Sequence, residues 1–278
     1  MAIETVDGLI KALGNDNSPF IIDKASIANA VAGQQFSLWR ATGQPAQAAI
    51  PVAAAIPTGA TLGAMPLTNQ TAPRFPYLGF LYLNSSLTTM SPEIHDRVAQ
   101  GIGNGSFVSI VSQTTIAVDV LTLGLVAARR GAANYSDLQW WLEVYTDGGA
   151  TASNATVNVT YNDATTGNLN VIAVGGTLRA GRMISLTAFI PTADQGKFIR
   201  GINSVINSAS TTVAGAFGFT CTRLMAPAPL IVANATVKFS WEELGQPLTP
   251  NDACLFIIML TSTTSTGTLK GGGKIAYG

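Results

Sequence analysis

The sequence predicts a mainly β protein: an antiparallel β-sandwich or jelly roll with a short α-helical N-terminal region and an extended strap rich in proline and alanine. Beyond residue 105, short segments rich in β-branched and aromatic residues follow one another. Turn signals separate them at intervals of roughly 8 to 15 residues, and no long amphipathic helix intervenes. This spacing favours a sandwich over a parallel α/β sheet.

Residues 1–40 form the first predicted segment, with two short helices. Thr5 is placed to cap a helix that carries apolar residues at positions 6, 9, 10 and 13, and Gly14 stands where such a helix ends. Ser26 can cap a second helix that ends near Gly33. Isolated helices of this length are marginal in water, so both are expected to pack on the main body or on a neighbouring subunit.

Residues 41–92 form the predicted strap. Arg74 is the only charged residue in this stretch, prolines recur throughout it, and the tetrapeptide AAIP occurs at 48–51 and again at 54–57. Frequent proline disfavours both a helix and a central strand, so an extended, partly polyproline-like path is expected. An uncharged apolar strap should lie against protein, either its own domain or an adjacent subunit. The predicted subunit contacts are Ile50, Pro51, Ile56 and Pro57.

Residues 93–278 form the predicted β domain. Residues 154–161 alternate between apolar and polar side chains, and Phe217, Phe219 and Cys221 repeat every second residue, so each set should share one face. The expected strands are 107–111, 115–126, 138–145, 154–161, 169–174, 183–190, 199–206, 213–222, 236–241 and 253–261.

The charge content restricts the possible partners. Charged residues make up 11% of the chain, against roughly 25% in ordinary soluble domains. Some of the surface is therefore expected to face protein rather than water. Basic and acidic residues number fifteen each without a strong basic cluster, which argues against nucleic acid as a partner. No secretory leader or membrane span is expected, and Cys221 and Cys254 are expected to be reduced core thiols.

The chain offers little catalytic chemistry, so we expect no enzyme, no metal and no cofactor. His95 is the only histidine, and neighbouring residues in a strand point apart, so Asp96 beside it does not make a relay. One histidine and two distant cysteines cannot supply a four-ligand zinc site. The glycine-rich stretch 101–105 precedes a strand instead of opening a helix, so a turn is expected rather than a phosphate-binding loop.

Trp140 and Trp141 are adjacent in a predicted strand, so their rings should face opposite sides. At most one of them is expected in the core of a one-sided sheet. The other would contact a subunit, the strap or a sugar. These two residues are therefore the candidate glycan contacts if the protein binds a glycan.

Several segments occur in a fixed order along the chain: 36–43 (FSLWRATG), the strap, 95–97 (HDR), 141–146 (WLEVYT), 181–183 (GRM), 217–220 (FGFT) and 252–255 (DACL). In order and spacing, over nearly the whole chain, these segments resemble a family of tailed-bacteriophage virion proteins. The resemblance implies a structural role in the virion, without catalytic residues or cofactor.

Three functional hypotheses follow. The first is a capsid decoration, cement or minor capsid protein that binds the major capsid protein or other virion proteins and forms a homo-oligomer, with a trimer favoured. The second is a tail or head-fibre protein that binds a host receptor or glycan. The third is a hydrolase whose acidic residues come from separate strands.

Overall fold

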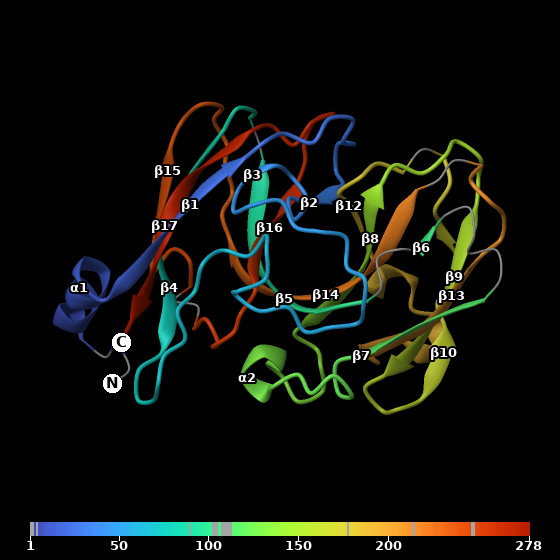
Figure 1. Cartoon of the computed structure of the whole chain (residues 1–278), viewed down its shortest axis with the longest axis horizontal. Helices are drawn as coiled ribbons and strands as arrows, with labels where there is room; N and C mark the ends of the chain where they lie inside the picture. Colours follow the sequence, from blue (N-terminus) through green and yellow to red (C-terminus); the bar gives the residue numbers. More distant parts are fainter. Residues whose placement is uncertain are drawn as a thin grey trace. The chain divides into compact units, whose positions relative to one another are not determined.

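The protein is mainly β with antiparallel sheets, and its helices are few and short. The computed structural model describes the whole chain except residues 1, 2, 4, 89, 102–104, 107–112, 177, 213–214 and 246–247 (Figure 1). Two compact units are present, each made of discontinuous stretches. Unit 1 comprises Met1–Ala48, Pro57–Asp96 and Leu224–Gly278, and unit 2 comprises Ala49–Ile56 and Arg97–Arg223. This division differs from the three consecutive segments expected, because strands that are distant in sequence pair within each unit.

Helix α1 (Val6–Gly14) confirms the first predicted helix. The Thr5 hydroxyl accepts a hydrogen bond from the Gly8 amide at 3.0 Å and so caps the helix as expected. The second predicted helix is wrong. The Ile27 amide donates to the Thr266 hydroxyl and the Gly33 amide donates to the Thr261 carbonyl, so backbone groups of this stretch bond to the C-terminal part of unit 1.

Unit 1 contains a five-stranded antiparallel sheet in the order β15-β4-β17-β1-β3. Along β1, side chains alternate between exposed and buried from Pro19 onward. The strands are β15 (Val237–Ser240), β4 (Pro76–Ser85), β17 (Leu269–Tyr277), β1 (Asn17–Lys24) and β3 (Gly43–Gln44).

A second group of strands in unit 1 pairs in the order β5-β16-β2. These are β5 (Ser91–Gln100), β16 (Leu255–Leu260) and β2 (Gln35–Ser37), and β5 continues into unit 2 after Asp96. The apolar core of unit 1 draws on both groups, since Phe20 and Leu81 cluster with Ile94 and Ile257. Burial of these side chains provides the main favourable contribution to folding.

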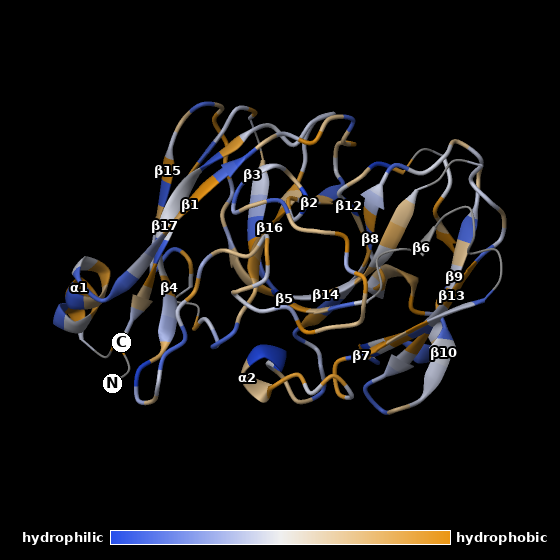
Figure 2. Ribbon diagram, viewed as in Figure 1, coloured by the Kyte–Doolittle hydropathy of each residue, from blue (hydrophilic) through white to orange (hydrophobic). Residues whose placement is uncertain are grey.

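Unit 2 likewise has two groups of strands. One is β10 (Thr166–Asn168), β9 (Asn154–Tyr161), β13 (Ile199–Asn207) and β7 (Thr114–Asp119), with β11 (Ile172–Ala173) also on β9. The other is β12 (Arg182–Ser185), β8 (Leu138–Thr146), β14 (Ala216–Pro227) and β6 (Gly105–Ser106), and β14 continues into unit 1 after Arg223. Arg223 donates to the Ala128 carbonyl of the short helix α2 (Ala127–Arg130). Val157 and Ile202 from the first group share one apolar core with Leu142 and Phe219 from the second. Figure 2, coloured by hydropathy, shows hydrophobic residues along several strands, β7 among them.

The predicted strands agree most closely with the observed ones in unit 2. Strands β8, β9 and β13 confirm the predictions at 138–145, 154–161 and 199–206, and β14, β15 and β16 confirm three more with shifted ends. The strand expected at 183–190 is partly wrong, because β12 ends at Ser185 and the 3₁₀ turn Thr187–Phe189 follows. The strand expected at 107–111 lies outside the described residues. Strands β1, β4, β5 and β17 were not predicted from the pattern.

The predicted strap is shorter than expected. Residues 45–75, all described, contain no helix and no strand beyond an isolated bridge between Ala55 and Gln100. At Pro76 the chain enters β4, which lies between β15 and β17. Proline is tolerated at the first residue of a strand, so Pro76 does not prevent this pairing. The part of the expectation that extended the strap to residue 92 is therefore wrong.

The sequence pattern did not predict strand β17, because the strand contains three consecutive glycines, Gly271 to Gly273. A Cβ atom on Gly271 would overlap the Tyr82 carbonyl oxygen, and one on Gly272 would lie 2.5 Å from the Phe20 carbonyl oxygen. The neighbouring strands thus approach β17 too closely for side chains at these positions. Glycine, which weakens most strands, is required here.

Substituting Gly271 by alanine should destabilise the fold by about 2 kcal/mol or more, because the added methyl group forces β4 and β17 apart. Urea unfolding followed by circular dichroism measures the change. The control is Gly14→Ala at the end of α1, where no atom lies within 4 Å of the added methyl. Equal stability of the two variants would show that β17 does not need its glycines.

Candidate functional site

The strap residues predicted as subunit contacts are not its most exposed ones. Pro51 and Pro57 are buried, and Ile50 and Ile56 are half-buried, so much of their surface already packs within the chain. Between them, Val52 is 83% exposed, more than any other large hydrophobic side chain described. Sequence pattern could not separate Val52 from its neighbours, because an irregular segment has no periodicity that reveals which side faces water.

The paired tryptophans do not form a surface platform. Trp140 and Trp141 are both buried, so the one-sided sheet, in which at most one of them would belong to the core, is not what this strand forms. Strand β8 is covered on both faces: Trp140 joins the apolar cluster of unit 2, and the Trp141 indole N–H donates to the Thr222 hydroxyl at 2.8 Å. Neither ring offers an exposed face for stacking against a sugar.

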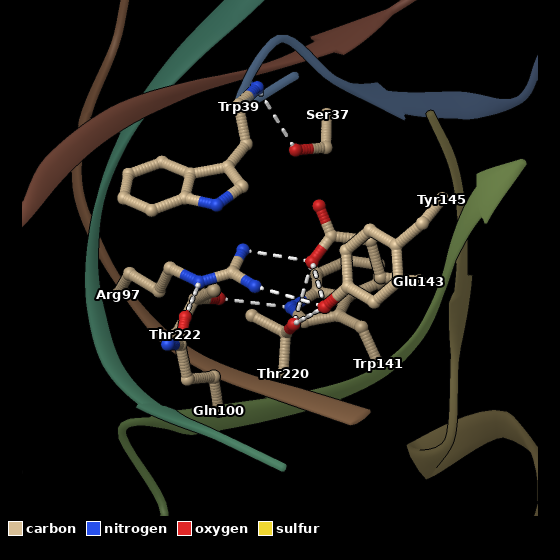
Figure 3. Close-up of polar contacts among 9 residues, drawn as sticks. All are labelled: Ser37, Trp39, Arg97, Gln100, Trp141, Glu143, Tyr145, Thr220 and Thr222. Atoms are coloured by element: carbon tan, nitrogen blue, oxygen red, sulfur yellow. Dashed lines mark hydrogen bonds and ion pairs between the residues drawn. The ribbon is translucent and has the colours of Figure 1, made fainter. Parts of the chain in front are cut away.

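The second face of β8 carries a buried ion pair that the sequence did not reveal (Figure 3). Arg97 Nη1 on β5 lies 2.7 Å from Glu143 Oε2 on β8, and both side chains are almost completely inaccessible to solvent. The same carboxylate oxygen accepts hydrogen bonds from Thr220 at 2.6 Å and from Tyr145 at 3.2 Å. Thus a single glutamate oxygen accepts two hydrogen bonds from hydroxyl groups and forms an ion pair with a guanidinium, and its three partners come from three strands.

The other two guanidinium nitrogens of Arg97 are hydrogen-bonded as well. Arg97 Nη2 donates to the Tyr145 hydroxyl at 3.0 Å, and Arg97 Nε donates to Gln100 at 3.1 Å. Burial, followed by the negative charge of Glu143, raises the pKa of Tyr145 well above its usual value. The phenol therefore remains protonated and donates to Glu143. Sealed from solvent, these groups join β5, β8 and β14 rather than meeting a dissolved substrate.

His95 and the cysteines are interior residues. His95 is fully buried, lies 3.1 Å from Glu93, and packs against the Phe256 ring. Burial lowers the pKa of its imidazole, with Glu93 opposing that shift in part, so the ring is held neutral at pH 7. Cys221 and Cys254 are both buried and do not form a disulfide with each other, in agreement with the prediction of core thiols.

Lys24 is a buried lysine that faces backbone carbonyls. Its ammonium donates to the Ala41 oxygen at 3.1 Å and to the Pro45 oxygen at 2.6 Å, and it thereby ties the end of β1 to the start of the strap. Burial lowers the pKa of Lys24 to about 8. The charged form is tolerated because two carbonyl dipoles replace part of its lost hydration.

A groove of about 530 Å³ runs beside β1 in unit 1, and we call it the edge groove. Its lining comprises residues 19–21, 44–46, 59–64 and Pro66, and none of these residues is charged. Ile21 on its rim is 67% exposed. The edge groove thus combines an apolar surface with one side of a β-strand.

A second groove of about 480 Å³ lies between α1 and the neighbouring sheet, where Leu9 and Leu13 face Phe80 and Trp241. On the same helix, Val6, which also lines this groove, and Ile10 are 73% and 64% exposed. They lie four residues apart, so they form one apolar stripe on the helix surface.

The structure gives no metal site among its described residues: no three His, Cys, Asp or Glu side chains gather there closely enough to hold an ion. No helix in the described part of the chain is long and apolar enough to cross a membrane.

The ion pair yields a stability prediction. Arg97→Met should destabilise the protein by about 3–5 kcal/mol, because Glu143 is left charged and unpaired in the interior. The double variant Arg97→Met/Glu143→Leu should recover much of this loss, since no buried charge then remains. Chemical denaturation of the three proteins measures the coupling. Equal stability of the single and double variants would contradict a paired role.

Lys24 yields a pH prediction. Its pKa is lower in the folded chain than its ordinary value of 10.5, so the unfolded chain binds more protons between pH 8 and 10.5. The free energy of unfolding of the unmodified protein should therefore rise relative to Lys24→Met over this window, by about 1–3 kcal/mol. Urea unfolding at pH 7.5 and 10 measures the change. The exposed residue Lys270 provides the control variant, Lys270→Met, and a similar pH trend there would refute the assignment.

Comparison with known proteins leaves the family open. No protein-family model matches the chain, and no curated protein matches it, so the resemblance to tailed-phage virion proteins stays a prediction. Two solved structures align over 97% of this chain and 86% of theirs, each at 10% identity: the VP2 subviral particle of infectious bursal disease virus, with a TM-score of 0.20, and the Gt strain of that virus, with a TM-score of 0.19. At these TM-scores the alignments carry no argument about fold or function.

Proposed function

We propose that this chain is a structural subunit of a virus particle and that it works by assembling with other protein subunits, copies of itself included. More specifically, the chain is a decoration, cement or minor capsid protein on a tailed-phage head and is built from β-sandwich units. Its partners are then the major capsid protein and its own copies, with a trimer favoured. The observation that carries the proposal is a surface poor in charge that leaves large apolar side chains exposed.

The exposed apolar side chains occur on distinct elements of the chain. Val6 and Ile10 project from α1, Ile21 from β1, and Val52 and Leu62 from the strap. Single exposed apolar residues are normal on protein surfaces, whereas an apolar stripe on a helix and an apolar rim beside an uncharged groove are typical of surfaces that bind protein. With charged residues at only 11% of the chain, few ionic groups are available to keep such surfaces apart from one another.

We also propose that the role is non-enzymatic. The only histidine is buried and held neutral, and the ion pair of Arg97 and Glu143 is sealed within unit 2. General acid–base catalysis requires a titratable group within reach of the substrate. The grooves described above are lined almost entirely by apolar and uncharged residues, with Glu242 as the one acidic residue among them.

A direct test of the proposal is cryo-electron microscopy of virus particles purified from the source of this sequence. The chain should occupy a fixed, symmetric position and bury at least roughly 1,200 Å² against its neighbours, as stable interfaces do. Purified particles that lack the chain would contradict the virion role.

In solution, the purified chain should self-associate as its concentration rises, measured by sedimentation velocity. The double variant Ile10→Lys/Val52→Lys should weaken association at least tenfold, because two charges would enter apolar contacts. Asn170→Lys adds a charge at another exposed position and is the control. A chain that stays single at every concentration would contradict self-assembly.

A further inference from the structure

The edge of β1 beside the edge groove is largely unpaired. β17 pairs with all of Asn17–Lys24, whereas β3 pairs with Asp23 and Lys24 alone. No other described strand lies on that side of β1. An uncovered strand edge is a template for another strand.

The backbone orientation shows which groups face this open side. The Phe20 carbonyl points toward Gly272 on β17, while the Asp23 carbonyl points toward Gly43 on β3. Because backbone groups alternate direction along a strand, the N–H and C=O of Ile21 and the C=O of Pro19 face the open side. One donor and two acceptors thus line the edge groove, and the missing N–H of Pro19 limits pairing to a short stretch.

We propose that the edge groove receives an extended strap segment, centred on Val52, of a second copy of this chain. This inference rests on the proposed function, since it names the contact through which copies assemble. The segment adds a short strand to β1 by backbone hydrogen bonds, and the Val52 side chain packs on the apolar rim beside Ile21.

Charge and size support this occupant. Residues 41–73 contain no charged side chain, and neither does the lining of the edge groove. Entry therefore leaves no buried charge without a partner. The groove is walled in part by Gly59, Ala60, Gly63 and Ala64, which leave room for a strand. Residues 53–55 of the strap are alanines, so the incoming segment is narrow.

The strap segment also has backbone groups available. The amides of Val52, Ala53 and Ala54 donate no hydrogen bond to the described residues, while the Ala55 amide donates to the Gln100 carbonyl.

A contact between the strap of one copy and β1 of the next is heterologous, so each copy carries both the strap and the β1 edge that the contact needs. Repetition of such a contact closes a ring or extends an array, as a particle component requires.

Chemical cross-linking of two separately purified full-length variants, Ile21→Cys and Val52→Cys, tests the contact. Both native cysteines are buried, so a short bismaleimide should react with the introduced thiols under native conditions. The mixture should give a covalent dimer containing one copy of each variant, at least tenfold above the yield from either variant alone. Val171→Cys, at another exposed valine, replaces Val52→Cys as the control.

A second variant, Ile21→Pro, removes the outward N–H and should weaken self-association at least tenfold in sedimentation velocity. Its pairing with β17 should be retained, and circular dichroism checks this. Three results would show that the strap contact is wrong while the proposed function stands. They are a chain that assembles without giving the mixed dimer, an Ile21→Cys variant that cross-links mainly to itself, and a Val171→Cys variant that reacts as well as Val52→Cys. A chain that never self-associates refutes self-assembly and this contact together.

Discussion

The buried pair of Arg97 and Glu143 is the constraint on which the strand register of unit 2 depends. Side chains of a strand alternate between faces, so a slip of one residue in β8 would move Glu143 into the apolar cluster and Leu142 into the polar network. A buried charge without its partner costs several kcal/mol, which excludes such a slip. The contribution of this ion pair is therefore specificity of pairing among β5, β8 and β14 more than stability.

The same alternation explains the unusual composition of these strands. In β8 one face supplies Trp140, Leu142 and Val144 to the apolar cluster, and the other carries Trp141, Glu143 and Tyr145. Both faces are covered, so nearly every residue of the strand is removed from water. A sheet covered on both sides needs few charged residues, and this is one reason why the chain as a whole has so few. Its surface is solvated mainly by uncharged polar groups instead.

In unit 1, by contrast, strand β1 is not fully covered. β1 is covered along one edge by β17 and left open along most of the other, where an uncharged groove runs beside it. Proteins usually protect such an edge with charge, proline or a covering loop. Here Pro19 protects one position, while Ile21 remains exposed with its backbone groups unpaired by a strand. An edge of this kind is consistent with a subunit that is completed by a neighbour.

The sequence by itself determined the β class, the capped helix at Val6–Gly14, the buried core thiols and the strands with clean alternation, such as β9. These features depend on local periodicity and capping, which a short stretch of chain contains. Strands β5 and β17 were decided by tertiary structure, because charged residues or glycines replace the apolar pattern there. Their stability comes from partners distant in sequence: Glu143 for Arg97, and the close backbones of β1 and β4 for the glycines. The burial of both tryptophans and the exposure of Val52 were likewise decided only by packing, since a residue's neighbours in space, not in sequence, determine which of its faces meets water.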